Sequence, residues 1–589
     1  MKILGISLGH DSNFALVEDG QIKAVMEAER YFRQKRYKLS AQTLAPGKIA
    51  SGYQYTDVSD LKMFLEVIKK EWGSSYDALA VQNQGRKDEH ENLLKLLKEE
   101  GFSFNKAENV NHHLSHASLS YFTSPFSEAL ILSYDGIGND GKTVFFKAFG
   151  NAIEYLTNIP IAFGQSYNNM GYVCGIKPEI EGTTSGKAMG LTSYGAVHES
   201  WLPYATRYVR DYQKLPNLPI EGLNTYGKAA HINSRHLEDI PELKKYLVKR
   251  ATPLTGWKNR LKVFFGILSD YELRLLGPKD KDAQDLAATV QEAWTQEVLK
   301  LLKEHRGNFK NLCVVGGCAL NGTTNYEIEN SGLFEKVHFI PNPSDCGLAA
   351  GAALHLSYSK DGSHLLFSGA KQHYSPYLGS EPYDLSKLQE LKTRYPYKEI
   401  PQDKLPQVLA KLVAEDHIVG FIRDRYEVGP RALGNRSILC NPLNPNMREI
   451  LNDKVKHREW YRPFAPMVTE EDASKYFTNK APVPYMSVIC DTKEEYRTKL
   501  PSITHVDGTA RIQTVRESQH PIIYKALKEF EKLKGMPIFL NTSYNPAGEP
   551  ILNFCEVGLE MLDKTDLDLV IIENIIFTNH AKKHLLETI

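Results

Sequence analysis

The chain has 589 residues, 42% of them hydrophobic, and its 71 basic side chains balance its 71 acidic ones. This length predicts two to four domains with large cores, and the balanced charge gives no indication of a nucleic acid or an anionic membrane as partner. The start of the chain lacks a signal-peptide pattern, no apolar run reaches bilayer length, and the seven cysteines are scattered without a CxxC pair, so we expect a cytoplasmic protein with reduced thiols.

Two strand-turn-strand segments begin the chain's predicted structure. In each, an apolar strand is followed by a turn that contains glycine and aspartate. The first turn includes His10 and Asp11, and the second is Asp135–Gly138. Such glycines let backbone approach a phosphate, and the aspartate can hold a cation beside it. The pair is similar to the two phosphate hairpins of the actin-like ATPase fold. The predicted strands are residues 3–8, 14–17, 22–25, 129–134 and 143–149.

Between the hairpins lie the charged segment 27–36, EAERYFRQKR, and an amphipathic helix predicted near 59–72. A charge run of this kind is usually a solvated helix face. Its position directly after the first hairpin makes Lys35 a candidate residue of the pocket for the acceptor substrate.

A metal site is predicted just before and after the second hairpin. His112 and His116 are four residues apart, so on a helix they share one face and can bind one ion. The alternative is that the two histidines only pack or cap that helix. Asp135 lies in the turn that follows, and Asp345, after a later predicted strand, is the natural further ligand.

A nucleotide site is predicted from glycine-bearing segments. Segment 182–195, GTTSGKAMGLTSYG, lacks the Walker A spacing, so contact with phosphate and a plain loop are equally open readings. The predicted strand at 312–315 opens on two glycines, which suits close approach to adenosine or phosphate. A small-residue helix over 348–356 is expected to pack tightly beneath Asp345. The nucleotide candidates are Asp135, Gly136, Gly164, Lys187, Gly190, Gly317 and Asn321.

The C-terminal part carries cations and small hydroxyls on turns. Residues 357–384 are rich in Ser, Gly, His and Pro, so we place a linker there between domains at 1–356 and 385–589. A helix is predicted at 403–415 and a strand at 418–422. Arginine's planar fork matches phosphate oxygens, and buried cations without partners need an anion. Surface ion pairs with neighbouring acids are the alternative.

Several motifs resemble, in order and spacing, the carbamoyltransferases of nodulation and of antibiotic or toxin tailoring, and more distantly the tRNA threonylcarbamoyl-transferases. They are VNHHLSHA (110–117), GGCALN (316–321), GPRALGNRS (429–437), RPFAP (462–466) and NTSYN (541–545). The family's usual GGVGLN and its small residues after His-Asp differ here, which bears on the shape of the acceptor pocket. The resemblance implies an α/β protein with a duplicated actin-like ATPase domain and a YrdC-like domain that binds carbamoyl phosphate. The residues at its carbamoyl phosphate positions are Arg431, Lys456, Arg462, Arg511, Asn541 and Ser543.

We therefore expect an ATP-dependent O-carbamoyltransferase that uses carbamoyl phosphate and ATP with magnesium, through carbamoyl-adenylate, to modify a hydroxyl of a small natural product. His112, His116, Asp135 and Asp345 are expected to hold a divalent metal; their atoms suit iron(II), zinc or manganese, and the resemblance favours iron(II). His10 is the expected base on the acceptor hydroxyl. The sequence does not identify the acceptor, and it leaves open whether the protein forms a homodimer. The alternatives are a tRNA threonylcarbamoyladenosine synthase and an actin-like ATPase switch without covalent transfer.

Overall fold

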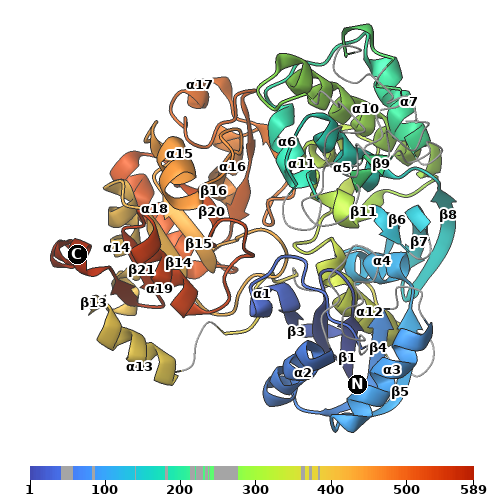
Figure 1. The fold of residues 1–589 in the computed structure, drawn as a ribbon, viewed down its shortest axis with the longest axis horizontal. Helices are drawn as coiled ribbons and strands as arrows, with labels where there is room; N and C mark the ends of the chain where they lie inside the picture. Colours follow the sequence, from blue (N-terminus) through green and yellow to red (C-terminus); the bar gives the residue numbers. More distant parts are fainter. Residues whose placement is uncertain are drawn as a thin grey trace, which may run out of the picture.

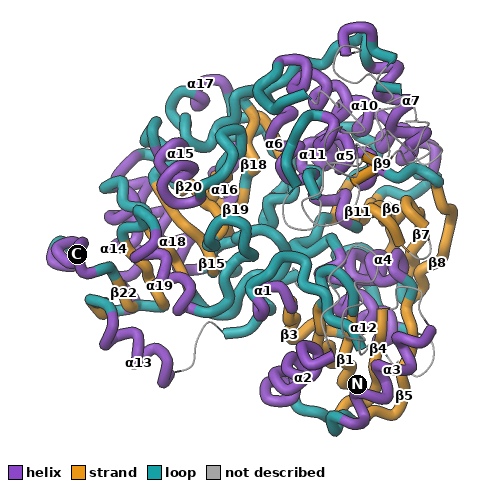
Figure 2. The backbone as a smooth tube through the Cα atoms, in the orientation of Figure 1, coloured by secondary structure: helices purple, strands orange, loops and turns teal. Residues whose placement is uncertain are grey.

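The computed structural model describes residues 1–41, 58–82, 87–138, 141–178, 183–212, 219–220, 230–231, 236–237, 239–243, 276–359, 365–370, 374–381 and 385–589. The described chain forms two lobes side by side, the N-terminal lobe on the right of Figure 1 and the C-terminal lobe on the left. Loops run through the junction between them (Figure 2). Within these ranges no helix is long and apolar enough to cross a membrane. The charged segment 200–280 is predicted from its sequence to be mainly helical, but most of it lies outside the described residues.

The N-terminal lobe contains the same five-stranded sheet twice. The strand orders are β3-β2-β1-β4-β5 and β8-β7-β6-β11-β12. In each sheet the first three strands of the chain pair antiparallel, and the last two run parallel to the first. The repeat of order and direction is an internal duplication, which agrees with the expected actin-like architecture. The strands are β1 (Lys2–Ser7), β2 (Asn13–Glu18), β3 (Gln21–Glu27), β4 (Ser75–Gln82), β5 (Ser103–Val110), β6 (Glu128–Gly138), β7 (Gly141–Phe149), β8 (Ala152–Ile159), β11 (Asn311–Val315) and β12 (Lys336–His338).

Two helices pack against each other between these sheets: α4 (His112–Phe122) and α12 (Leu348–Tyr358). Their close approach depends on glycine. A Cβ at Gly351 of α12 would collide with the carbonyl oxygen of Ser115, and a Cβ at Gly5 of β1 would collide with that of Ala349. The prediction of a tightly packed small-residue helix is confirmed, and its packing holds the two halves of the duplication together.

The other helices of the N-terminal lobe cover the outer faces of the sheets. Alternation along β1 sends Ile3 into the core between the sheets and Leu4 and Ile6 into the core under α2 and α3. The helix predicted near 59–72 is confirmed as α2, whereas segment 182–195 contains a helix, α6, and is not a plain loop. The remaining elements are α1 (Ala28–Phe32), α2 (Val58–Trp72), α3 (Lys87–Glu99), α5 (Phe163–Val173), α6 (Ser185–Thr192), α7 (Leu202–Asp211), β9 (Pro219–Ile220), β10 (Ala230–His231), α10 (Lys281–His305) and α11 (Gly322–Asn330).

The C-terminal lobe is built on one eight-stranded sheet with the order β13-β22-β21-β14-β15-β20-β16-β19. Helices α14 and α18 pack together against one face, and the predicted helix at 403–415 and strand at 418–422 are confirmed as α14 and β14. The strands are β13 (Tyr397–Glu399), β14 (Val419–Ile422), β15 (Arg436–Cys440), β16 (Ala465–Thr469), β17 (Ile489–Asp491), β18 (Thr509–Arg511), β19 (Gln513–Val515), β20 (Ile538–Ser543), β21 (Leu569–Ile572) and β22 (Ile575–Phe577). The helices are α13 (Leu385–Arg394), α14 (Leu405–Ala414), α15 (Met447–Ile450), α16 (Glu470–Tyr476), α17 (Glu494–Arg497), α18 (Pro521–Lys534) and α19 (Cys555–Lys564).

The described parts of segment 357–384 are hydrogen-bonded to both lobes. The amide of Ala370 donates to the carbonyl of Ser124 over 2.7 Å, and the carbonyl of Leu378 accepts from the amide of Val25 over 2.8 Å. On the other side, the amide of Gly379 donates to the carbonyl of Tyr426 over 2.9 Å. These stretches therefore join the lobes. The domain limits themselves, and the YrdC-like character of the C-terminal lobe, stay predictions.

Candidate active site

Four side chains that are far apart in the sequence form one cluster between the sheets of the N-terminal lobe. His112 and His116 project from one face of α4, Asp135 from β6, and Asp345 from a short 3-10 turn, η4 (Asp345–Gly347). One ligand atom from each lies within 4.8 Å of all the others. The Nε2 atoms of both histidines are 3.2 Å from Asp135 Oδ2 and 3.7 and 3.5 Å from Asp345 Oδ1. The structure thus brings all four predicted metal ligands together.

The cluster fits one divalent metal ion in geometry and in charge. Two ligand atoms about 2.1 Å from an ion in tetrahedral geometry are about 3.4 Å apart, which matches the nitrogen–oxygen separations. Burial opposes the charged form of Asp135, but hydrogen bonds with His112 and His116 outweigh it and hold its pKa well below the usual range. Asp135 is therefore a carboxylate, the form that binds metal. Nδ1 of His116 is buried without a hydrogen-bond partner among the described residues.

Glycines shape the strand that carries Asp135. The predicted turn at Asp135–Gly138 is wrong in one respect: β6 continues through it to Gly138, with an irregular register between Tyr134 and Gly138. A Cβ at Gly138 would lie 2.7 Å from the His113 ring, and one at Gly317 would lie 2.7 Å from Asp135 Oδ1. These glycines are needed for packing around the cluster, because larger residues would displace its side chains.

Three further nucleotide candidates have defined surroundings. A Cβ at Gly164, at the start of α5, would lie 2.9 Å from the amide nitrogen of Gly136, whereas a Cβ at Gly136 would meet open space. Gly136 therefore borders open space beside Asp135. Asn321 has a structural role: its Oδ1 accepts from the amide of Thr324 at the start of α11, and its Nδ2 donates to Gln291.

His10 lies at the edge of the metal cluster. Its Nε2 is 3.4 Å from Asp345 Oδ2, its Nδ1 is 2.9 Å from Asp11 Oδ2, and its side chain is 40% exposed. Burial lowers the pKa of His10, but Asp345 and the hydrogen bond with Asp11 outweigh burial and raise that pKa to about 9. The expected catalytic residue thus has one ring nitrogen oriented by a carboxylate and the other facing the metal ligands.

A second cluster, the anion site, lies in the C-terminal lobe. Arg431, Arg462 and Arg511 are close enough to repel one another: burial and Arg462 lower the pKa of Arg431 to about 10, and burial with both other arginines lowers that of Arg511 strongly. The Nε atoms of Arg431 and Arg511 are buried without a hydrogen-bond partner among the described residues. Clustered cations of this kind are stabilised by a bound anion.

Lys456 lies beside these arginines, at the end of a π-helix, η6 (Leu451–Lys456). It is 4% exposed, and its Nζ donates to the carbonyls of Ser543 and Asn545 over 2.7 and 2.9 Å. Burial, Arg458, Arg462 and Lys35 all lower its pKa. Lys35, predicted at the acceptor pocket, therefore lies close to the anion site, to which the N-terminal lobe adds a charge.

The two candidates on β20 differ in their partners. The Ser543 hydroxyl donates to Asn545 Oδ1 over 2.6 Å, next to Lys456. Nδ2 of the Asn541 side chain donates to the carbonyl of Ala432 and to Gln513 Oε1, each over 2.9 Å, whereas its Oδ1 is buried without a partner among the described residues. Ser543 is thus at the lysine end of the anion site, and Asn541 supports the loop that carries Arg431.

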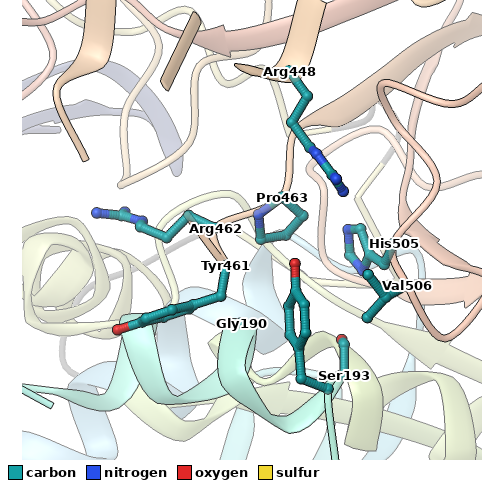
Figure 3. A pocket seen from close by; sticks show the side chains of 9 residues that line it. Gly190, Ser193, Arg448, Tyr461, Arg462, Pro463, His505 and Val506 are labelled. Carbon is teal, nitrogen blue, oxygen red and sulfur yellow. The ribbon is translucent and has the colours of Figure 1, made fainter. Parts of the chain in front are cut away.

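A pocket opens where α6 of the N-terminal lobe meets the C-terminal lobe (Figure 3). Arg448 points into it beside His505, and Arg462 extends from the same loop as Pro463. Burial lowers the pKa of His505 to about 4, so its ring is neutral. The sequence analysis missed Arg448 and His505 because no local motif marks them. The pocket is lined by Gly190, Ser193, Tyr194, Arg448, Tyr461, Arg462, Pro463, His505 and Val506.

The nucleotide candidates of α6 face the C-terminal lobe at this pocket. Lys187 forms an ion pair with Glu459 and donates to the carbonyl of Lys177 over 3.2 Å. A Cβ at Gly190 would lie 3.3 Å from the carbonyl oxygen of Tyr461. Both residues therefore lie at the lobe junction.

Comparison with known proteins gives a consistent result. The family model described as carbamoyltransferase N-terminus matches residues 2–354, and that described as carbamoyltransferase C-terminus matches residues 410–579. The uncharacterized protein sll1178 of Synechocystis sp. is 30% identical, with 98% of this chain and 97% of that protein covered. Nodulation protein NolNO of Sinorhizobium fredii is 30% identical (96% and 78%). Nodulation protein U of the same species is 29% identical (93% and 94%).

Two solved structures are distantly similar. Full-length HypF in its phosphate- and nucleotide-bound form has a TM-score of 0.29 at 11% identity and covers 62% of this chain and 56% of that chain. A ROK hexokinase from Thermus thermophilus has a TM-score of 0.27 at 15% identity and covers 60% and 98%. Because both family models match in order and together span most of the sequence, the chain belongs to the carbamoyltransferase family and is a carbamoyltransferase enzyme.

Proposed function

We propose that this carbamoyltransferase is ATP-dependent and moves a carbamoyl group from carbamoyl phosphate, through carbamoyl-adenylate, to a hydroxyl of a small natural-product acceptor. The observation that carries the proposal is the anion site, where Arg431, Arg462 and Arg511 repel one another around buried Nε atoms. The phosphate of an acyl phosphate offers the charge and the pairs of oxygens that planar guanidinium groups bind. Carbamoyl phosphate combines that anion with the group that the family transfers.

In the first step, the arginines and Lys456 bind the phosphate of carbamoyl phosphate, and water hydrolyses the acyl phosphate anhydride to carbamate and phosphate. The cations stabilise the charge that develops on the departing phosphate. Carbamate then attacks the α-phosphate of ATP, which forms carbamoyl-adenylate and releases pyrophosphate. The junction pocket, with Arg448 beside a neutral His505, supports a nucleotide at this boundary between the lobes.

In the second step, the acceptor hydroxyl attacks the carbamoyl carbon and AMP leaves. His112, His116, Asp135 and Asp345 would hold the metal, which we propose is iron(II). A bound divalent metal would polarise the carbamoyl carbonyl as a Lewis acid and offset the charge of Asp345. With that charge offset, the neutral imidazole of His10 is favoured. Asp11 then orients Nδ1–H, and Nε2 accepts the proton of the acceptor hydroxyl.

The test of the overall reaction supplies ATP, carbamoyl phosphate and a panel of hydroxylated natural products. We expect phosphate, pyrophosphate and AMP, together with an acceptor heavier by one carbamoyl group in mass spectrometry. Release of ADP and phosphate without pyrophosphate would refute the proposal in favour of an ATPase switch. Carbamoyl label in tRNA, rather than in a small acceptor, would favour the threonylcarbamoyladenosine alternative.

A second test separates the two steps. Arg431→Ala should stop phosphate release from carbamoyl phosphate, whereas His10→Ala should leave phosphate and pyrophosphate release intact. Supplied with chemically prepared carbamoyl-adenylate, the Arg431 variant should carbamoylate the acceptor and the His10 variant should not. Arg516→Ala, which removes an arginine paired with Glu470 in the same lobe, serves as the control. If the His10 variant is rescued, the assignment of His10 to the transfer step is wrong.

A further inference from the structure

The loop that carries Arg431 is held by an arginine of the other lobe. Arg30, in α1, is 1% exposed, although it belongs to a charged segment expected at a solvated face. Its guanidinium donates to the carbonyl of Glu427 over 3.2 Å and to that of Gly429 over 2.6 Å. It also lies 5.2 Å from the centre of the Tyr426 ring. Arg30 therefore binds backbone directly before Arg431.

Glu27 supports Arg30 and binds the same loop. Its Oε2 is 3.0 Å from Nε of Arg30, and its Oε1 accepts from the amide of Gly429 over 2.9 Å. The amide of Glu27 donates to the Tyr426 hydroxyl over 3.1 Å. Arg30 and Glu27 thus bind both the carbonyl and the amide of Gly429. These contacts restrict how the backbone before Arg431 can move.

The same loop also packs close to the metal centre. Gly429 has φ +91°, and a Cβ there would collide with the carbonyl oxygen of Pro341. Pro341 begins the segment that leads to the metal ligand Asp345. On its far side, the loop is fixed within its own lobe, since Glu427 Oε1 accepts from the amides of Leu433 and Arg436 over 2.5 and 3.2 Å. Arg431 lies between these two anchors.

We propose that Arg30 is a positioning residue of the anion site: held by Glu27, it fixes the backbone at Glu427 and Gly429 and so places the guanidinium of Arg431 at the phosphate. The inference rests on the proposed function of that site. Arg30 contacts the loop and does not reach the substrate itself. A shift of about 1 Å in a group that binds a reacting molecule is enough to reduce a rate about a hundredfold, so this anchor has a measurable consequence.

A role limited to holding the lobes together makes a different prediction. In that case the loss of Arg30 lowers the stability of the protein, and its effect on binding is the same whichever residue stands at position 431. If Arg30 acts through Arg431, the effects of the two substitutions on binding are not additive. A double-mutant cycle on the full chain therefore separates the two explanations.

The cycle uses Arg30→Met, which keeps the apolar stem and removes the donors, and Arg431→Lys, which keeps a charge and measurable binding but loses the fork. Carbamoyl phosphate affinity is measured by calorimetry. We expect Arg30→Met to weaken binding about tenfold or more in the wild-type background, and less than about twofold in the Arg431→Lys background. Arg30→Lys should restore part of the affinity. Arg210→Met, which removes an ion pair with Glu297 inside the N-terminal lobe, should bind as wild type.

Each outcome is decisive. Wild-type affinity in Arg30→Met, with binding lost in Arg431→Ala, overturns the inference and leaves the proposed function intact. An equal loss in both backgrounds also overturns it, because Arg30 then only stabilises the protein. Absence of carbamoyl phosphate binding by the wild-type protein overturns the proposed function and this inference together. If Arg30→Met does not fold, Glu27→Gln replaces it in the cycle with the same expected non-additivity, since the ion pair that orients Arg30 is lost.

Discussion

Replacing Arg431 by methionine should stabilise the ligand-free protein while abolishing its binding of carbamoyl phosphate. Burial and Arg462 lower the pKa of Arg431 from 12.5 to about 10. At about 1.36 kcal/mol per pKa step, the charged side chain destabilises the folded state by about 3 kcal/mol. Both folded and unfolded forms are protonated at pH 7, so this cost is fully present there and is relieved only as the pH rises through about 10. Partial exposure of the side chain reduces the net gain to roughly 1–3 kcal/mol.

The assay compares melting temperatures with and without ligand. One kcal/mol shifts the melting temperature of a unit the size of the C-terminal lobe by about 2–4 °C, so ligand-free Arg431→Met should melt at least about 2 °C above wild type. Carbamoyl phosphate at a hundred times its dissociation constant stabilises a binding protein by about 2.7 kcal/mol. Wild type should gain that stability and the variant should not, so adding the ligand should raise the melting temperature of wild type alone.

The control is Arg516→Met, whose arginine is paired with Glu470 in the same lobe; it should show neither the gain without ligand nor the loss of ligand response. The reasoning fails if ligand-free Arg431→Met melts below wild type, because the arginine would then be stabilised by partners within the protein. It also fails if carbamoyl phosphate raises the melting temperatures of wild type and variant equally, because the anion would then bind elsewhere.

Three further predictions concern the metal centre and acid stability. His116→Ala should lose the metal in elemental analysis while circular dichroism stays unchanged; full occupancy would contradict the site. Gly317→Ala would bring a Cβ within 2.7 Å of Asp135 Oδ1 and should weaken metal binding, whereas Gly186→Ala, with open space around its Cβ, should not. Burial lowers the pKa of His520 to about 4. Between pH 6.5 and about 4 the unfolded chain therefore binds more protons than the folded chain, and acidification through this window should reduce the free energy of unfolding by about 3 kcal/mol. His520→Asn keeps a cap for α18 and should remove that loss in denaturant titrations; an unchanged acid profile would show that His520 is not responsible.

Local sequence patterns were sufficient for the elements that carry the metal ligands. The four-residue spacing of His112 and His116 places both on one face of α4, because helical periodicity depends only on neighbours in the chain. The small residues of 348–356 likewise predicted the close packing of α12. The strand patterns of the two hairpins located β1, β2, β6 and β7 for the same reason.

Only the tertiary structure shows how these elements come into contact. Asp345 was predicted as a further metal ligand, but it reaches Asp135 and the two histidines because two separate sheets pack around α4 and α12. Segment 27–36 has the composition of a solvated face, yet Arg30 is buried, because carbonyls of the C-terminal lobe accept from its Nη2 and Glu27 offsets its charge. Lys35 of the same segment lies close enough to Lys456 of the other lobe to lower the pKa of that lysine. A side chain's environment is set by what packs against it from distant parts of the chain, so burial and charge partners are properties of the fold and not of the segment.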